Sequence, residues 1–554
     1  MIPILILGLF FHPTIGSDMD DIIRKLDGIA NKEDLSALLL RRMNAELMLL
    51  NRASADLEWL EATSPSPEVS QETTKLSHLK TTWRNFWCAK TPRIHVGPAG
   101  SRMLELLCRG PKYTPHQAKA LTAIFKELST SYVTATVCRI EENQEKCYNG
   151  EPELERLMST SRNESELRWA WTSWRNEMSK VKGLFTTAVT LQNLGARNNG
   201  YHDLGECWRE ELESPHLETL VDQLYQSVEP LYRLLHAVVR FRLAEVYPGL
   251  IDLRGPIPAH LLGNMWSQNW ESLVDLLMPN GNIFGNVNEA LIRKNYTVRD
   301  MVERAEDFYT SLGLPPMSRE FWERSIFEKD NRTKLNCHAT AANMYKNDDF
   351  RVLACLQVSA QDFYVIHHEM GHIQYYMAYK NQPAIFMDGA NSAFHEAVGD
   401  AIMYGVLTPQ HMQRLGLAND SALSNDLPLL LKQALGKLPQ MPHALIMDKW
   451  RWDVFSGKIK DSLYNKAWWE LNKKYLGIEP PVARNDDSFD PAAKFHITDN
   501  TPYIRYFLGY VLQVQLFEGM CQAAVTGKVG DPLFKMPLHR CDIYGSKDAG
   551  RRLK

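Results

Sequence analysis

The spacing of apolar residues constrains the fold more than any other feature of this chain. Along much of the sequence they recur at alternating steps of three and four, which is typical of amphipathic helices. The clearest run ends before Ser64-Pro-Ser-Pro67 and consists of Leu40, Met43, Leu47, Leu50, Leu57 and Leu60. Segments 229–242 and 503–522 follow the same period, whereas segment 351–359 alternates like a strand. We therefore expect a mainly α-helical protein, in which the 40–60 helix packs on the body rather than forming a dimerising coiled coil.

Composition excludes several classes of protein. The chain has 554 residues, of which 44% are hydrophobic, and 62 Lys and Arg against 66 Asp and Glu give a net charge of −4. This composition is that of a folded protein with a large core, and the balanced charge argues against nucleic acid as the main partner. No apolar run reaches the roughly 18–20 residues that cross a bilayer. Since we find no repeats or long linker, we expect a single domain over residues 17–554.

The N-terminus has the pattern of a secretory signal. An apolar run over residues 2–11 is followed by Thr14-Ile15-Gly16, whose ends suit the −3 and −1 positions of a cleavage site. We predict a signal peptide over residues 1–16 and a secreted, extracellular protein; a buried N-terminal strand or helix is the alternative. Four candidate glycosylation sequons agree with export: Asn163, Asn295, Asn331 and Asn419.

Nine cysteines also suit an oxidising compartment. Six form local pairs along the sequence, namely Cys138 with Cys147, Cys337 with Cys355, and Cys521 with Cys541. Such pairs are typical of disulfides that staple loops. The partners of Cys88, Cys108 and Cys207 stay open, and the odd count leaves at least one thiol free.

A metal-binding pattern lies in the middle of the chain, at His368-Glu369-Met370-Gly371-His372. Ser359 and Asp362 suit the start of a helix, on which the two histidines would lie one turn apart on one face. Glu369 would then reach a water on the bound ion. Chance gives roughly 0.03 such matches in a chain of this length, so a structural helix with surface histidines is the alternative.

A third ligand would decide between these readings. A second expected helix, over residues 392–402, places Glu396 where it can fold back beside the histidine pair. Asp400 lies one turn further and could accept the outer N–H of a metal-bound imidazole. Two histidines, one carboxylate and an open position describe a catalytic zinc site. We read the neighbouring His367 and His395 as core or supporting residues rather than ligands.

A second polar cluster lies near the C-terminus. Lys494 and His496 alternate as on an extended segment, and Tyr503 and Tyr506 share a side of a helix that begins at Pro502. A peptidase needs donors for an oxyanion and a cation for a substrate carboxylate, and this cluster offers both. Surface cations and core tyrosines are the alternative.

Together these residues resemble the angiotensin-converting enzyme family of zinc peptidyl-dipeptidases, which release C-terminal dipeptides. The resemblance covers most of the chain and is carried by His367-His-Glu-Met-Gly-His-Ile-Gln-Tyr-Tyr376 and by segments 255–268, 308–314, 337–339, 394–400, 450–452, 502–506 and 541–544. It implies a helical ellipsoid divided by a deep central channel, with a lid of N-terminal helices and a minor short β-hairpin. It also implies the three local disulfides, Cys138–Cys147, Cys337–Cys355 and Cys521–Cys541.

The resemblance assigns roles to the site residues. One Zn²⁺ would be held by His368, His372 and Glu396, and Glu369 would be the general base. The oxyanion would be stabilised by Tyr506 and His496, and the substrate carboxylate would be bound by Gln268, Lys494 and Tyr503. The backbone of the last two substrate residues would lie along His338 and Ala339. A monocarboxypeptidase relative has Arg at the Gln268 position, so Gln268 predicts release of dipeptides from oligopeptides with a free C-terminus.

The chain also departs from the family pattern. Arg175 and Trp468 match the first chloride site, but Asn472 replaces its second Arg. Arg505 matches the second site, where Leu212 replaces a Tyr. We expect chloride activation to be weak or absent.

Two further departures concern substrate choice and the end of the chain. Ala342-Asn343 replace a usual Trp-Asp, which predicts an altered substrate preference. The sequence stops short of the usual C-terminal helices without a membrane anchor, which suggests a soluble secreted form and raises the question of its stability. A catalytically weak or silent binding protein and an endo-oligopeptidase are the alternatives. Intact metal ligands argue against the first, and Gln268, Lys494 and Tyr503 argue against the second.

Overall fold

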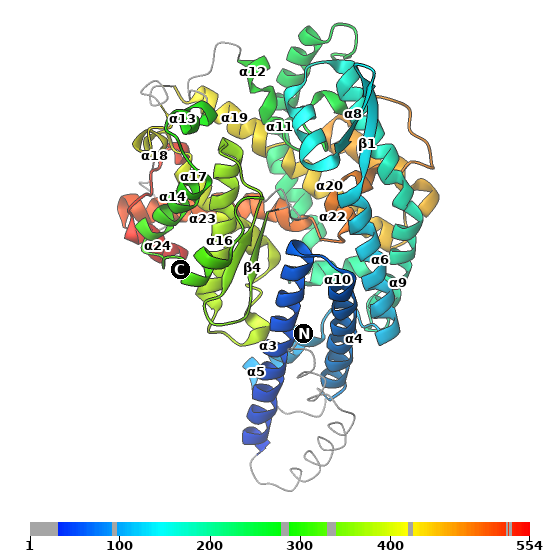
Figure 1. Cartoon of the computed structure of the whole chain (residues 1–554), viewed down its shortest axis with the longest axis vertical. Coiled ribbons are helices and arrows are strands. Elements are labelled where there is room, and N and C mark those ends of the chain that lie inside the picture. The colour runs from blue at the N-terminus through cyan, green and yellow to red at the C-terminus, as the bar shows by residue number, and fades with distance from the viewer. Residues whose placement is uncertain are drawn as a thin grey trace.

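Helices dominate the computed structural model of the chain, which confirms the predicted fold class (Figure 1). The structure describes residues 32–90, 97–278, 287–329, 339–418, 425–527, 530 and 535–554. Several sequence-based predictions lie outside these residues, namely the signal peptide, Cys337, His338, Asn331 and Asn419. Among the described helices, none combines the length and apolar character needed to cross a membrane.

The first core contains most of the large aromatic residues, including Trp171, Trp174, Trp270 and Trp450. Its elements are α6 (Pro115–Thr134), α7 (Glu155–Thr160), α8 (Glu164–Met178), α9 (Lys182–Arg197), α10 (Leu204–Glu210), α11 (Leu217–Val246), α12 (Val274–Leu277), α19 (Leu427–Lys437), α20 (Gln440–Phe455), α21 (Tyr464–Leu471) and α22 (Phe495–Thr498). Two short strands, β3 (Ile257–Pro258) and β6 (Ile478–Glu479), pair in parallel beside them. A 3₁₀ turn, η10 (Asp490–Ala493), leads into α22.

The second core lies beside the first and holds the predicted metal helices. Its elements are α13 (Val287–Arg293), α14 (Val298–Ser311), α15 (Arg319–Arg324), β4 (Thr340–Asn343), β5 (Phe350–Leu353), α16 (Ala360–Tyr379), α17 (Ser392–Val406), α18 (Pro409–Arg414) and α24 (Lys547–Leu553). The long α23 (Ile504–Thr526) joins the two, since Phe507 is buried in the first core and Phe517 in the second. In Figure 1 the second core lies on the left and much of the first on the right.

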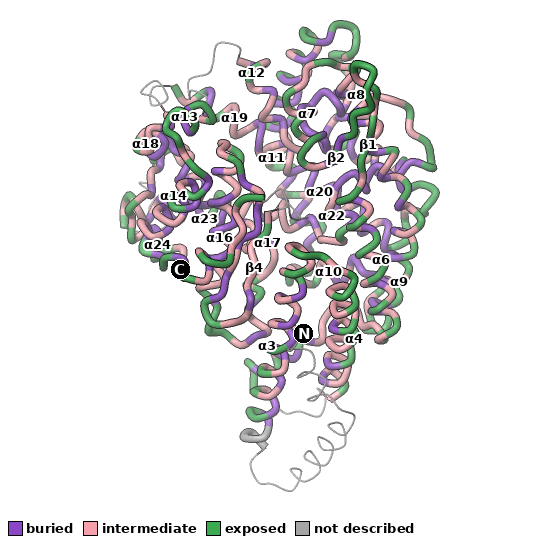
Figure 2. Tube along the Cα trace, viewed as in Figure 1, coloured by how far each residue is buried: buried purple, intermediate pink, exposed green. Residues whose placement is uncertain are grey.

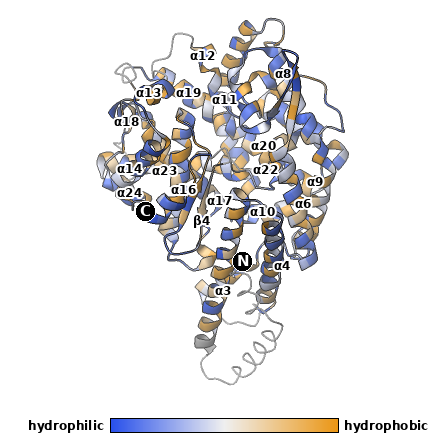
Figure 3. Cartoon of the chain, in the orientation of Figure 1, coloured by the Kyte–Doolittle hydropathy of each residue, from blue (hydrophilic) through white to orange (hydrophobic). Residues whose placement is uncertain are grey.

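A third, smaller core holds the N-terminal helices together. It lies between α3 (Lys32–Thr63), α4 (Pro67–Lys90), α5 (Pro98–Cys108) and the turn at η6 (Ala384–Phe386). These helices carry both apolar and polar residues along their lengths (Figure 3). They project from the body, where most buried residues lie (Figure 2). The 40–60 run lies within α3, whose residues Leu47, Leu50 and Leu57 are buried in this third core.

The strands differ in part from the prediction. The strand expected over residues 351–359 is wrong beyond Leu353, because β5 ends there and Ser359 already caps α16. The β1–β2 hairpin, Thr136–Glu141 with Gln144–Asn149, is formed by a polar segment that lacks apolar alternation. Its two-residue turn at Glu142 and Asn143 has positive φ at both positions, as tight hairpins of primed type require.

Disulfide bonds cross-link this hairpin, the C-terminal segment and the segment around Cys355. Cys138 lies directly opposite Cys147 in the hairpin register, and the two are bonded, as are Cys521 and Cys541. Cys355 is also disulfide-bonded, while its predicted partner lies outside the described residues.

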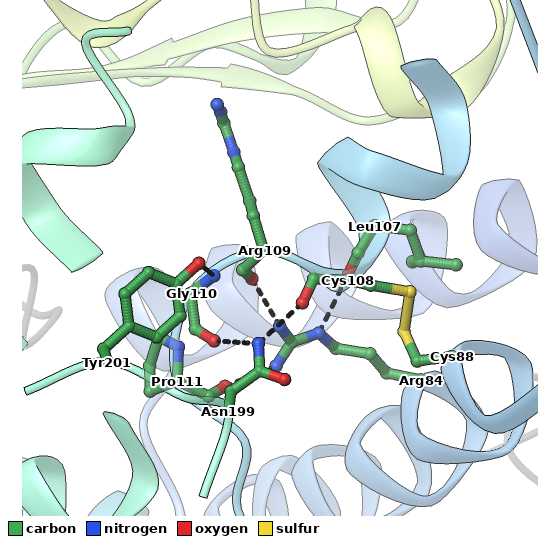
Figure 4. The surroundings of a disulfide bond; sticks show 9 residues. All are labelled: Arg84, Cys88, Leu107, Cys108, Arg109, Gly110, Pro111, Asn199 and Tyr201. Atoms are coloured by element: carbon green, nitrogen blue, oxygen red, sulfur yellow. Dashed lines mark hydrogen bonds between the residues drawn. A yellow bond between two sulfur atoms is a disulfide. The ribbon is translucent and has the colours of Figure 1, made fainter. Parts of the chain in front are cut away.

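A further disulfide, which the sequence left open, joins Cys88 of α4 to Cys108 of α5 (Figure 4). Beside it the Arg84 guanidinium donates to three backbone carbonyls of the α5 end, those of Leu107, Arg109 and Pro111. Asn199, an exposed residue just after α9, donates to the carbonyl of Cys108 at 2.9 Å. The disulfide thus fixes α5 to α4 next to the body. Among the cysteines that the structure describes, Cys207 is the free thiol, and it is buried.

Candidate metal centre

Two facing glycines allow the helices of the predicted metal site to approach closely. A Cβ on Gly371 of α16 would lie 2.4 Å from Gly399 Cα of α17, and one on Gly399 would lie 2.5 Å from the His368 carbonyl oxygen. Neither position tolerates a side chain without moving a backbone. Asn391 caps α17 by accepting from the Phe394 N–H, so Glu396 falls in its second turn. This packing brings Glu396 to the histidine pair on α16.

His368, His372 and Glu396 gather into one group whose ligand atoms all lie within 4.8 Å of one another. The two Nε2 atoms are 3.2 Å apart, and Glu396 Oε2 lies 3.6 Å from His368 Nε2. Ligand atoms bound at about 2.0–2.1 Å to one tetrahedral ion lie about 3.3–3.4 Å apart. The separations therefore fit a single Zn²⁺ held by two imidazoles and a carboxylate, with a position left for solvent or substrate.

The outer nitrogen of His368 is held by Asp400. The two atoms, His368 Nδ1 and Asp400 Oδ1, are 2.9 Å apart, the contact that the sequence analysis proposed. Lys437 Nζ donates to the other Asp400 oxygen at 2.9 Å, and the Tyr364 hydroxyl also donates to Asp400. Although burial opposes the charge, Lys437 and His368 hold the pKa of Asp400 well below its usual value. Sequence reasoning missed Lys437 and Tyr364, because neither lies near Asp400 in the chain.

His372 has a different outer partner. Its Nδ1 lies 2.8 Å from Nδ1 of His395, whose Nε2 is 2.9 Å from the Tyr379 hydroxyl. His395 thus contacts a candidate ligand from its outer side. His367 is fully buried, and its Nδ1 lies 2.7 Å from the Phe363 carbonyl oxygen. Burial lowers the pKa of His367 to about 4, as expected for a core histidine.

Glu369, the predicted base, is buried between the candidate metal group and β4, the first strand of the β4–β5 hairpin in the second core. Only 7% of it is exposed, and α16 packs on β4 at this point. Burial raises the pKa of Glu369 to about 7, which the neighbouring His368 partly opposes. A carboxylate desolvated in this way binds a proton readily near neutral pH. Ala339, which precedes β4, is half-buried, and Ala342 and Asn343 lie within β4.

The second predicted cluster lies on the side of the first core. The ring centroids of Tyr503 and Tyr506 are 4.5 Å apart, and the Tyr506 hydroxyl lies 3.0 Å from His496 Nε2. The Tyr503 hydroxyl donates to Gln268 Oε1 at 3.3 Å, which joins positions 235 residues apart in sequence. Burial and then the charge of Glu396 raise the pKa of Tyr506, so this group lies within electrostatic reach of the metal ligands.

One detail of this cluster was wrong. Lys494 is extended, but His496 lies in α22, so the two do not share a strand side. The short helix forms because the chain turns after η10, where Trp174 and Trp266 both donate to the Ala493 carbonyl oxygen, at 3.1 and 2.6 Å.

Lys494 stands out among the charged residues of the site. It is only 8% exposed, and its Nζ lies 3.7 Å from the centroid of the Trp266 ring. Within the described residues it forms no salt bridge, and burial lowers its pKa. Glu151 and Glu155 oppose this lowering of the pKa through space without a direct salt bridge in the part of the chain that the structure describes, so the position suits an anionic ligand.

Arg175 and Trp468, the residues predicted for the first chloride site, line a small cavity of about 10 Å³ together with Asn472 and Lys494. Arg175 is buried there and donates to the Met265 carbonyl oxygen at 2.9 Å, and burial lowers its pKa to about 9. Asn472 donates to the Trp468 carbonyl oxygen at 2.9 Å. Arg505 precedes Tyr506 in α23, and Leu212 packs against the first core.

Two of the predicted glycosylation sites lie in the described structure, and both are exposed. Asn163 caps α8 by accepting from the backbone N–H groups of Ser165 and Glu166. Asn295 follows α13 in a left-handed backbone conformation, with φ of 53°.

Comparison with known proteins places these features in a family. A family model described as "Angiotensin-converting enzyme" matches residues 31–554. The chain is 45% identical over 437 residues to the angiotensin-converting enzyme of Bos taurus, an alignment that covers 78% of this chain and 32% of that protein. It is 40% identical over 439 residues to the enzyme of Theromyzon tessulatum, covering 78% and 70% of the two chains. The angiotensin-converting enzyme-like protein Ace3 of Mus musculus is 43% identical over 433 residues, covering 77% and 57%. The chain thus spans about a third of the length of the Bos taurus relative.

Proposed function

Because the chain belongs to the angiotensin-converting enzyme family, we propose that it is a zinc-dependent peptidyl-dipeptidase that removes dipeptides from the C-terminus of oligopeptides. The observation that carries this proposal is the pairing of two groups. A three-ligand metal group lies within electrostatic reach of a buried tyrosine pair, and Tyr503 of this pair donates to Gln268, near the buried Lys494. Metal chemistry and carboxylate recognition are what an exopeptidase of this kind has to combine.

In this role His368, His372 and Glu396 hold the ion. Bound Zn²⁺ supplies a Lewis acid for the scissile carbonyl and lowers the pKa of the attacking water. Asp400 and His395 accept or share the outer imidazole protons, which fixes the ring orientation of both histidine ligands.

Proton transfer falls to Glu369. Its carboxylate takes a proton from the attacking water and passes the proton to the nitrogen of the leaving amine. The buried position of Glu369 favours the protonated form that the second step needs. As negative charge develops on the carbonyl oxygen, Tyr506 and His496 donate hydrogen bonds to it.

The length of the released peptide is set on the side of the site that belongs to the first core. The carboxylate of a substrate C-terminus meets the Lys494 ammonium, the Tyr503 hydroxyl and the Gln268 amide, with Ala339 and His338 along the substrate backbone. Gln268 is short enough to leave room for two residues between this pocket and the metal, which yields dipeptides. Ala342 and Asn343 on β4 alter the preference for side chains in this region.

The chloride response follows from the cavity beside Lys494. Asn472 places a neutral amide where family members have a cation, and its side chain is bonded to the Trp468 carbonyl. Of the two Arg residues at this chloride site in the family, the chain keeps only Arg175, so we expect weak or absent activation by chloride. Activity that rose many-fold between zero and physiological chloride would contradict this.

The same proposal includes location and domain organisation. The disulfides of the described structure suit an oxidising compartment, as do Asn163 and Asn295, which are exposed and available to a glycan. We expect a signal peptide over residues 1–16, a single metallopeptidase domain over 17–554, and secretion.

A peptide assay tests this function. The protein is incubated with an N-terminally blocked tripeptide that has a free C-terminus, with and without chelator. Dipeptide release that stops with chelator and returns with Zn²⁺ is the expected result. Equal cleavage of the C-terminally amidated tripeptide would indicate an endopeptidase, and no cleavage by the zinc-loaded protein would indicate a silent binding protein.

A further inference from the structure

A cavity of about 630 Å³ lies where α13, α14 and α18 meet the C-terminal segment. These helices lie together in Figure 1, and none of the residues that line the cavity belongs to the candidate metal centre. We call it the α13–α18 cavity. Its volume falls within the range of roughly 300–1,000 Å³ that is usual for small-molecule sites, so it can hold more than solvent.

The charges around the α13–α18 cavity cancel. Its wall contains three cations and two carboxylates, namely Lys294, Arg304, Arg414, Asp300 and Asp307. A third carboxylate, that of Asp542, binds Arg414 directly. His411, which also lines the cavity, is uncharged, since burial lowers its pKa to about 3. Without a net charge the wall does not select an anion or a metal ion.

The wall nevertheless offers aromatic carbon and hydrogen-bonding groups. Arg414 lies 4.7 Å from the centroid of the Tyr544 ring, and the Tyr544 hydroxyl donates to Asp307 at 2.8 Å. Tyr296 adds a second aromatic ring. Arg304 makes no hydrogen bond or salt bridge within the described residues, so its donors are available to a ligand. Such a wall suits a neutral sugar, whose C–H groups pack on rings and whose hydroxyls take hydrogen bonds.

Asn295 places an attachment point for a sugar at this cavity. It is exposed, it lines the cavity, and it begins the sequon Asn295-Tyr296-Thr297. Its backbone is left-handed, with φ of 53°, and its N–H donates to the Ile292 carbonyl oxygen at 2.9 Å. The next N–H, that of Tyr296, donates to the Leu291 carbonyl oxygen at 3.0 Å. These bonds fix the turn that holds the Asn295 amide at the cavity.

We propose that the first sugars of a glycan on Asn295 occupy the α13–α18 cavity, which is therefore an intramolecular glycan-binding site. This inference rests on the secretion proposed above. During export the donor is a lipid-linked oligosaccharide. C1 of its first sugar forms a bond to Asn295 Nδ2, the bond from C1 to the diphosphate oxygen of the lipid breaks, and one amide proton is released with the diphosphate. The packed sugars then join the end of α13 to α14 and Tyr544.

Asn163 gives a matched comparison within the same chain. It is exposed and begins a second sequon, Asn163-Glu164-Ser165. However, it lies at the start of α8 in the first core and does not line the α13–α18 cavity. A glycan on Asn163 should therefore extend into solvent, whereas one on Asn295 should pack on protein.

Mass spectrometry of glycopeptides gives the first test. The full chain is expressed in eukaryotic cells whose glycans stay high-mannose, and it is collected from the medium. We expect glycans on both Asn163 and Asn295. A secreted chain with a glycan on Asn163 but none on Asn295 would overturn this inference and leave secretion intact. A chain that stays in the cytosol would overturn both.

Digestion of the folded protein tests where the sugars lie. An endoglycosidase that cuts between the first two N-acetylglucosamines should release the Asn295 glycan about tenfold more slowly than the Asn163 glycan, because packing protects that bond. After denaturation the two rates should be equal. Equal rates in the folded protein would show that the Asn295 glycan is free in solvent, which contradicts the proposal.

Substitutions in the wall locate the contact. Arg304→Met should speed release at Asn295 by about two- to tenfold, because the sugars lose a hydrogen-bond donor. Arg319→Met, on α15, is the control and should change nothing, since its side chain is 82% exposed and lies outside the cavity wall. Thr297 is kept, because it caps α14. Circular dichroism should match the parent chain in both variants, and an unchanged rate in Arg304→Met would overturn the placement of the sugars.

Discussion

The metal side and the carboxylate side of the candidate site are built in opposite ways. On the metal side the imidazoles of the candidate ligands have partners from their own chain, as in the contacts of Asp400 with His368 and Lys437. On the carboxylate side Lys494 is buried against Trp266 without a salt bridge among the described residues. In the proposed function, the first arrangement would hold the ligands in place before an ion arrives, and the second would leave a charge for the substrate to neutralise.

The two sides also differ in how the backbone is fixed. α16 and α17 meet directly at Gly371 and Gly399, so two regular helices position the ligands. On the other side the chain turns through η10 and α22, and buried polar groups hold these turns. Asp448 accepts from the N–H groups of Tyr503 and Ile504, and Arg451 donates to the His496 carbonyl oxygen at 3.1 Å. Irregular backbone can present groups from several directions, which carboxylate recognition requires.

The largest effect should come from the base on the metal side. Glu369→Gln keeps the shape of the side chain but removes its proton-accepting charge, so kcat should fall by about 10²–10⁴ while bound zinc stays stoichiometric. Steady-state kinetics and elemental analysis check both quantities. Glu323→Gln, an exposed change on α15, is the control, and retained turnover in Glu369→Gln would exclude this residue as the base.

A smaller effect is expected for the oxyanion donor that links the two sides. Tyr506→Phe removes one hydroxyl, which should lower kcat by about 10²–10³ with little change in KM. Tyr510→Phe, one turn further on α23, is the matched control. A variant that mainly raised KM would place the Tyr506 hydroxyl in substrate binding instead.

Next in size is the buried cation of the carboxylate side. Lys494→Met should lower kcat/KM by about 10–100-fold, mainly through KM, because it removes one charge-assisted hydrogen bond. With a C-terminally amidated substrate, the parent chain and Lys494→Met should have equally low kcat/KM. If the variant were impaired equally on free and amidated substrates, Lys494 would have a structural role only.

Lowering the pH should destabilise the folded chain through protonation of the buried His443 on the carboxylate side. Burial, with the nearby Lys494 and Arg175, lowers the pKa of His443 to about 3. The folded chain therefore binds the His443 proton less readily than the unfolded chain does, so stability is full above about pH 6.5 and is lost progressively toward pH 3. At about pH 5 this loss amounts to about 2 kcal/mol. His443→Phe should lose less Tm than the parent chain when the pH is lowered from 7 to 5, and equal losses would contradict this.

The smallest effect should be on zinc affinity through Lys437. Lys437→Met leaves Asp400 without its cation and should weaken Zn²⁺ binding about tenfold, while Lys437→Arg should restore much of it. Competition with a chromophoric chelator measures the affinity. Unchanged affinity in Lys437→Met would show that Asp400 needs only His368 and Tyr364.

Local patterns predicted the metal side better than the carboxylate side. The spacing of His368 and His372, and of Glu396 and Asp400, reflects one turn of a helix, so it is readable from the sequence. Lys437 and the bond between Tyr503 and Gln268 depend on packing between distant segments, which no local pattern records. Here the family resemblance supplied Gln268, and nothing supplied Lys437.

Errors in the predicted elements have similar physical causes. The 351–359 alternation looked like a long strand, but the cap at Ser359 ends it early. The β1–β2 hairpin has little apolar alternation, and it contains the Cys138–Cys147 bond and a tight turn, neither of which an alternating pattern records. The Cys88–Cys108 bond joins two helices whose meeting could not be inferred from cysteine spacing alone.

Diffraction at the zinc absorption edge tests the central claim most directly. Crystals of the zinc-loaded chain should show one anomalous peak within about 2.0–2.2 Å of His368 Nε2, His372 Nε2 and a Glu396 oxygen. A peak at another place, or none at this group in protein that hydrolyses the tripeptide, would contradict the account.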